Sequence, residues 1–368
     1  MSHSRQIEFE RGFSLVEMLV ALATTLLISA ASLALVASSL KFANATYNLT
    51  ESEQSLRTAN ETLNRDLTTA GDGLRGIGKI MTPVGFAQSY LTRSPVLNGA
   101  DTTHANIGLL TSDFNIPANT PVPQSSPAVN FLPGSDRLTM LVKDSSFADV
   151  SVAAGKITQV GSNTFVIVPS TQIGRFQVGE IYAVVSSDAT LGFISAINAT
   201  TFTLTLSSGD LYSINQTGAT SPIYSVGLLN SSLISTQAVA LVRFQLIQYY
   251  ADANGLLHRR VFGVGGSPFV DSIVAEHVTN LQFRYVTNLA DANGFVTQPV
   301  RAITSTEQTA VREVETTVAV DTARPVNVVT NPNSTTNLCG ANPNGKQNIC
   351  STTTTTVRNL QFRNASIP

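Results

Sequence analysis

The chain has 368 residues, enough for two or three domains, and carries 22 lysines and arginines against 24 acidic residues. Its net charge of -2 lacks the basic excess of a nucleic-acid-binding surface, so no nucleic-acid partner is expected. Charged residues make up 12% of the chain, about half the share that is usual in globular proteins. The 2 cysteines exclude a disulfide framework and, by themselves, a thiolate zinc site.

A long apolar stretch lies close to the N-terminus. From Met18 to Leu40 there are 23 consecutive uncharged residues. A helix of this length spans about 34 Å, enough to cross the roughly 30 Å hydrocarbon core of a bilayer. A cleavable secretory signal and a plain membrane anchor are alternatives, but residues 1–12 carry no net positive charge. Neither alternative explains Glu17, because an acid at the edge of a membrane helix is costly and is therefore a functional candidate.

The residues at the start of this stretch carry a family motif. They read Gly12-Phe13-Ser14-Leu15-Val16-Glu17-Met18-Leu19. This segment resembles the type III signal of type IV pilins and type II secretion pseudopilins. The resemblance implies that residues 1–12 form a leader peptide, that a prepilin peptidase cuts after Gly12, and that the new N-terminal residue Phe13 is methylated.

The resemblance also implies a role for Glu17. The fifth residue after the cleavage site is Glu in the family, and counting from Phe13 that residue is Glu17. A cationic amine on Phe13 is costly to bury in an apolar helix bundle unless an acid pairs with it. Glu17 is therefore expected to pair with the terminal amine of an adjacent subunit and to set the axial register during assembly. The alternative is a carboxylate at the level of the lipid headgroups.

The helical pattern continues beyond the apolar stretch. After Lys41, apolar residues recur at spacings of three, four and seven as far as Leu67, with polar residues between them. Glycines from Gly71 onward are typical of a helix end. The spacing predicts one helix over residues 13–70, about 90 Å long. Residues 13–40 are predicted to be transmembrane, and the second half is predicted to pack against a head domain.

Two regions of different character follow the helix. Residues 71–135 are rich in Pro, Asn, Thr and Ser and predict an irregular connecting region on the surface. Residues 136–368 contain short apolar runs separated by Gly, Asn and Asp, which predict a β-rich head. The expected fold class is therefore α+β, a long N-terminal helix packed on a β-rich, pilin-like head. Strands are predicted over 138–142, 164–168, 181–186, 201–206, 242–246, 311–321 and 352–363.

A local duplication lies within the head. The pentapeptide Ala-Asp-Ala-Asn-Gly occurs at 251–255 and again at 290–294, in each case seven residues after a phenylalanine, Phe244 or Phe283. The Asn-Gly pairs predict two β-hairpin turns. A calcium loop is the less favoured interpretation, because an EF-hand needs further oxygen ligands and a distal Glu.

The two cysteines lie near the C-terminus. Cys339 and Cys350 flank a loop rich in Gly, Asn and Pro that has little core of its own. If the head is periplasmic or extracellular, as the membrane topology implies, a disulfide between them is allowed, and it would contribute about 3 kcal/mol. A Cys339–Cys350 disulfide is therefore predicted, with two free thiols as the alternative.

No catalytic constellation is found in the sequence. The 4 histidines are far apart, and no metalloprotease, nucleophile-elbow or phosphate-loop motif occurs. His258, beside Arg259 and Arg260, is interpreted as part of an exposed polar face. The chain is therefore not expected to be an enzyme, and no metal or cofactor is predicted.

The order of elements resembles that of PilW-type minor pilins. The resemblance rests on the Thr68-Thr69-Ala70-Gly71 helix exit, on the segments 176–180, 255–260 and 278–285, and on a terminal Thr-Val-Arg-Asn strand. It implies a minor pilin in a tip or assembly-initiation complex of a type IV pilus. Other pilins, the prepilin peptidase and the inner-membrane assembly platform are its implied partners. The head is expected in the periplasm before assembly and at the cell surface afterwards. A J-type pseudopilin of type II secretion and a membrane-anchored adhesin head are the alternatives.

Overall fold

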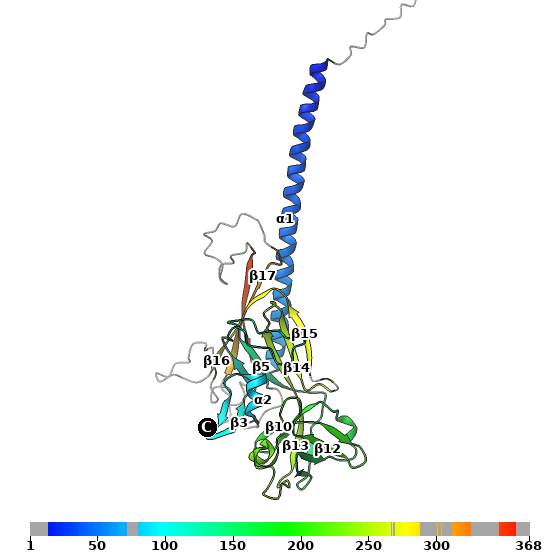
Figure 1. Ribbon diagram of the computed structural model, residues 1–368, viewed down its shortest axis with the longest axis vertical. Coiled ribbons are helices and arrows are strands. Elements are labelled where there is room, and N and C mark those ends of the chain that lie inside the picture. The colour runs from blue at the N-terminus through cyan, green and yellow to red at the C-terminus, as the bar shows by residue number, and fades with distance from the viewer. Residues whose placement is uncertain are drawn as a thin grey trace, which may run out of the picture.

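A computed structural model describes residues 14–71, 80–265, 267, 269–287, 300, 303, 311–324 and 346–357. One long helix, α1 (Leu15–Thr69), projects from a β-rich head (Figure 1). The short helical elements are α2 (Val84–Phe86), η1 (Ala87–Leu91), η2 (Ile173–Arg175), η3 (Gly218–Thr220) and α3 (Pro222–Ser225). The predicted α+β class and the predicted helix are confirmed.

The two halves of α1 have different surroundings. All side chains from residue 14 to residue 44 are exposed, and we call these residues the exposed segment of α1. From Ala45 onward one face is buried against the head, at residues Ser52, Leu56, Ala59, Leu63, Asp66 and Leu67. The helix ends before Gly71, whose φ of +75° is one that glycine tolerates, and the Gly71 amide donates to Leu141 O at 2.8 Å.

The largest sheet has 11 strands among the described residues. Its main path runs β15-β14-β13-β9-β10-β1-β3-β2, while β4 pairs with β5, and β5 and β6 pair with β13. These strands are β1 (Ile80–Pro83), β2 (Val96–Asn98), β3 (Asp101–Ile107), β4 (Leu110–Asp113), β5 (Arg137–Lys143), β6 (Val150–Val152), β9 (Ile181–Val185), β10 (Ala189–Phe193), β13 (Val239–Ala251), β14 (Leu257–Phe262) and β15 (Phe269–Ala275). The long strand β13 joins the two halves of this sheet, because its first half pairs with β6 and β9 and its second half with β5 and β14.

Two smaller sheets flank it. A four-stranded sheet of β7 (Ile157–Val160), β8 (Asn163–Ile167), β11 (Ala196–Asn198) and β12 (Thr203–Ser207) lies at the end of the head farthest from the N-terminus of α1 (Figure 1). An antiparallel sheet of β16 (Val278–Thr287), β17 (Val311–Asp321) and β18 (Asn348–Thr356) lies beside the buried half of α1.

Alternation along β9 separates the two larger apolar cores of the head. Ile181 and Ala183 belong to the core that also contains Leu63 of α1, while Tyr182 and Val184 belong to a second core beneath the four-stranded sheet. This follows from the geometry of a strand, in which successive side chains point to opposite faces. Both faces of β9 are therefore covered.

The predicted irregular character of residues 71–135 is wrong for residues 80–113. This stretch supplies β1 to β4 and several core side chains, among them Phe86 and Leu110, both almost fully buried. The strands are short and carry many polar residues, so their local pattern is weak. They are held by partners far away in the chain, since β1 pairs with β10 and β4 with β5. Residues 114–136 contain no strand, as expected.

The other predicted strands are found within a few residues of their expected bounds. Residues 311–321 form β17, and the last predicted strand is described as β18 up to Thr356. The first Asn-Gly turn joins β13 to β14 as a hairpin, with Gly255 at a φ of +78°. The second copy, 290–294, lies outside the described residues.

Candidate functional site

The exposed segment of α1 is the most unusual surface of the described chain. It carries large apolar side chains on all sides, such as Leu15 at 81% and Leu35 at 73% exposure. α1 is the one helix in the described part of the chain that is long and apolar enough to cross a membrane, judged by length and composition. An apolar surface of this extent marks contact with lipid or with other apolar helices.

The first turn of this segment contains Glu17. Its backbone N–H donates to Ser14 Oγ at 3.3 Å, and the Ser14 N–H donates to Glu17 Oε2 at 3.1 Å. This reciprocal pair is a capping box, which satisfies two backbone donors that would otherwise lack partners. Glu17 therefore stabilises the helix start and remains exposed. The predicted cleavage and methylation residues, Gly12 and Phe13, lie outside the described residues.

A buried polar contact fixes the other end of α1 to the sheet. Asp66 is 5% exposed and accepts from Tyr249 Oη at 2.7 Å and from Arg259 Nε at 2.5 Å. Burial raises the pKa of Tyr249, and the Asp66 carboxylate raises it further, so the hydroxyl stays protonated and can donate. This contact fixes the rotation and position of α1 on the head.

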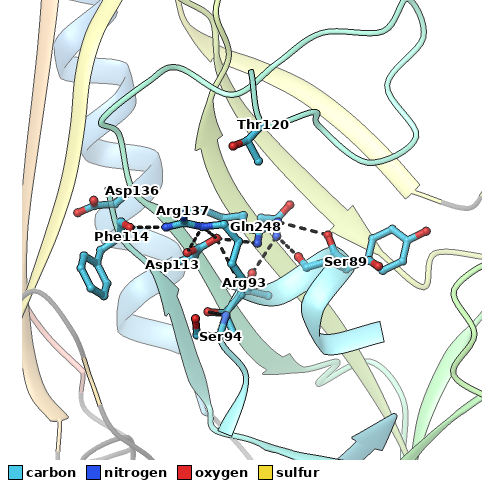
Figure 2. Close-up of polar contacts among 12 residues, drawn as sticks. Ser89, Arg93, Ser94, Asp113, Phe114, Thr120, Asp136, Arg137 and Gln248 are labelled. Carbon is cyan, nitrogen blue, oxygen red and sulfur yellow. Dashed lines mark hydrogen bonds and ion pairs between the residues drawn. The ribbon is translucent and has the colours of Figure 1, made fainter. Parts of the chain in front are cut away.

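A second polar cluster lies between β4, β5 and the segment after η1 (Figure 2). Asp113 accepts from Arg93 Nε at 2.9 Å through Oδ1 and from Arg137 Nη2 at 2.9 Å through Oδ2. Arg137 is 2% exposed, and its guanidinium lies 5.1 Å from the centre of the Phe131 ring. Burial lowers the pKa of Arg137, although the adjacent Asp113 acts in the opposite direction. The Asp113 carboxylate thus accepts from two arginines.

The interpretation of His258 as part of an exposed face is wrong. Its ring is stacked on Tyr250 at 4.8 Å between centres, and its side chain is 14% exposed. Nδ1 lies 3.0 Å from Asp271 Oδ1, and Nε2 lies 3.4 Å from Asp252 Oδ2. Pairing of β14 with β13 and β15 places these groups together. Asp252 also stabilises the turn between β13 and β14, because its Oδ1 accepts from the Asn254 and Leu256 amides.

The remaining predicted site residues are the two cysteines. Cys350 lies in β18 opposite Ala319 of β17, whereas Cys339 lies outside the described residues. Their disulfide stays a prediction. Within the described ranges, no group of three or more His, Cys, Asp and Glu side chains is arranged to hold a metal ion.

Neither of these two buried charge clusters was predicted from the sequence. Asp66 lies next to Leu67 in the buried stripe of α1, and an acid beside the apolar positions of an amphipathic helix was the available signal. The burial of Arg137 could not be predicted in this way, because its acidic partner Asp113 lies in a region that was predicted to be irregular. Sequence patterns identify charged residues well but do not identify which of them are buried.

No known protein family, curated protein or solved structure matches this chain. A long apolar N-terminal helix on a β-rich head is compatible with a pilin-like shape.

Proposed function

We propose that the chain is a minor subunit of a type IV pilus, anchored in the inner membrane by the exposed segment of α1 until it enters the filament. The observation that carries this proposal is that apolar side chains surround α1 from residue 14 to residue 44 while the head leaves all of them uncovered.

The two proposed environments of this segment satisfy the same physical requirement. A helix that is apolar all round is stable where lipid tails or other apolar helices surround it. A bilayer supplies the first environment, and a bundle of neighbouring pilin helices supplies the second. Transfer between them exchanges one apolar contact for another, so a subunit can leave the membrane without exposing its helix to water.

Glu17 provides the specific contact in this proposal. After cleavage at Gly12, its carboxylate would accept from the terminal amine of Phe13 on an adjacent subunit. That contact would compete with the Ser14 N–H for Glu17 Oε2, which lies on the exposed surface. A charge pair in an apolar bundle favours a single register, because any other register leaves both charges unpaired.

The size of the head supports a low copy number. About 300 residues follow the long helix, and a head of this size at every position of a fibre is sterically awkward. We therefore place the subunit in a tip or assembly-initiation complex. Because the chain has Glu17, it can join a subunit already inserted, so we place it behind the apex.

Mass spectrometry of the N-terminus tests the processing step. We expect a chain that begins at methylated Phe13 and a full-length chain when Gly12 is replaced by a bulky residue. An intact Met1, or a cut near residue 30, would overturn the pilin assignment.

Glu17→Ala tests the assembly step separately. We expect this variant to be cleaved normally but to assemble poorly with its partners. Site-specific crosslinking between residue 17 of the otherwise unchanged chain and the first residue of a partner subunit tests the contact directly. Glu51→Ala is the matched control, because Glu51 is another exposed acid on the same helix. A normal number of pili with Glu17→Ala would contradict the pairing. Labelling of the wild-type subunit along the whole length of the filament would contradict its location near the tip.

A further inference from the structure

The Arg93–Asp113–Arg137 cluster borders a pocket of about 400 Å³. Its polar lining comes from Thr92, Arg93, Ser94, Ser112, Asp113 and Asn115. Cavities that hold small ligands usually measure about 300–1,000 Å³, so this one accommodates a molecule the size of one sugar ring. Figure 2 shows Arg93 and Asp113 side by side in this region, with Phe114 and Ser94 beside them.

The acidic groups of this region are already engaged by protein donors. Both oxygens of Asp113 accept from arginine nitrogens at 2.9 Å. Asp136, which is fully buried and does not line the pocket, accepts from the Asn115 and Phe283 amides, both at 2.9 Å. Every oxygen of these two carboxylates already accepts a hydrogen bond from the protein. The pocket therefore offers no free carboxylate oxygen to a cation.

Hydrogen-bond donors remain on the pocket wall. Arg93 directs Nε to Asp113 and Nη2 to the Phe114 carbonyl at 2.7 Å. Its side chain is 37% exposed, and among the described residues Nη1 has no acceptor. Thr92 and Ser94 add hydroxyl groups to the same wall. A guanidinium edge beside hydroxyl groups is suited to a ligand that combines a carboxylate with hydroxyls.

We propose that this pocket binds a hydroxylated organic carboxylate of the sugar-acid class. The carboxylate receives the N–H groups of Arg93 Nη1, and the ligand hydroxyls contact the side chains of Thr92 and Ser94. A single exposed guanidinium matches one negative charge, whereas a phosphate dianion would bring a second charge, for which the described lining residues offer no further exposed cation. The head would thereby recognise an acidic glycan, a function that does not depend on processing at Gly12.

Binding to the full-length chain in detergent micelles tests this assignment, measured by calorimetry or ligand-observed NMR. The probes are glucuronate, glucose, glucose 6-phosphate and acetate. We expect glucuronate to bind most tightly, because it alone combines one carboxylate with several hydroxyls. Tighter binding of glucose 6-phosphate would overturn the carboxylate class. Equal binding of acetate would overturn the contribution of the hydroxyls, and the absence of binding by all probes would overturn the site.

Two variants locate the binding. Arg93→Gln should weaken glucuronate binding about tenfold to hundredfold, as expected for the loss of one charge-assisted hydrogen-bond pair. Ser94→Trp should block the pocket, and because Ser94 is exposed this variant is expected to fold normally. Arg57→Gln is the matched control, since Arg57 is an exposed arginine on α1. Wild-type affinity in both pocket variants, or an equal loss in the control, would refute the location.

Discussion

Asp66 is the buried charge that links α1 to the central sheet. It contacts Tyr249 and Arg259, which are far from it in the chain. Removing one member of a buried ion pair leaves the other members without their partner, which is more costly than the pair itself is worth. The contribution of Asp66 to stability therefore lies mainly in the cost of leaving Tyr249 and Arg259 without their shared partner.

We predict that Asp66→Ala lowers the free energy of unfolding of the head by about 3 kcal/mol, because it leaves the Tyr249 hydroxyl and the Arg259 guanidinium without their acceptor. Urea unfolding of the full-length chain in detergent measures this change. Glu61→Ala, at an exposed site on the same helix, is the control and should change stability by less than about 0.5 kcal/mol. Similar values for both variants would contradict the prediction.

His258 makes stability depend on pH. Burial alone would lower the pKa of His258, but the hydrogen bond and charge of Asp271 and the charge of Asp252 outweigh it. The pKa is therefore raised above its ordinary value of 6.5. The folded state binds the proton more tightly than the unfolded state. The resulting stabilisation is complete below the unfolded pKa and is lost as the pH rises through the folded one.

We predict that the free energy of unfolding of the wild-type chain falls between about pH 6 and about pH 9 by more than that of His258→Gln. The comparison removes the contribution of every other group that titrates in this range. Urea titrations of both proteins at the two pH values provide the measurement. Parallel pH profiles would show that the contacts of His258 with Asp252 and Asp271 do not stabilise its charged form.

The division of α1 into an exposed and a buried half is the main feature at the scale of elements. Both halves contain leucines, and their local helical geometry is the same. Leu63 is fully buried in the larger core, whereas Leu33 is 70% exposed. The contribution of a leucine to the stability of the head therefore depends on which half it occupies.

We predict that Leu63→Ala lowers the free energy of unfolding of the head by about 2–5 kcal/mol, since it removes buried methyl groups and leaves a cavity. Leu33→Ala makes the same chemical change on the same helix and should leave the head unaffected. Thermal unfolding of both variants in detergent compares them. An equal effect of the two substitutions would mean that the exposed half of α1 also packs against the head.

At the scale of the whole molecule, the structure consists of the apolar exposed segment of α1 and a folded head. The exposed segment contributes no side chain to any of the three apolar core clusters found among the described residues. Substitutions in the exposed segment of α1 should therefore change the membrane association of the protein without changing the stability of its head.

We predict that Leu27→Arg releases the protein from membranes while the melting temperature of the head stays unchanged. A cation near the middle of a membrane helix costs about 2.5–3.5 kcal/mol on insertion scales. Alkaline extraction of membranes followed by thermal unfolding measures both properties. Gln54→Arg is the control, because Gln54 is an exposed residue of the second half of α1. Retention of Leu27→Arg in the membrane would contradict this assignment of the exposed segment.

The sequence by itself determined the elements whose periodicity is local. The uncharged run from Met18 to Leu40, the apolar stripe up to Leu67 and the alternation in β13 each depend on neighbouring residues, so a helix and strands could be predicted from them. The Asn-Gly turn after β13 was predictable for the same reason, because its backbone conformation restricts the residues that can occupy it.

Only the tertiary structure decided which weak strands pair and which charges are buried. β1 pairs with β10, more than 100 residues later in the chain, and no local sequence pattern predicts this pairing. Asp113 and Arg137 form a buried pair because β4 and β5 lie side by side, and His258 is enclosed because β14 lies between β13 and β15. Burial is a property of the surroundings and not of the residue, so long-range pairing had to be known before these polar clusters could be recognised.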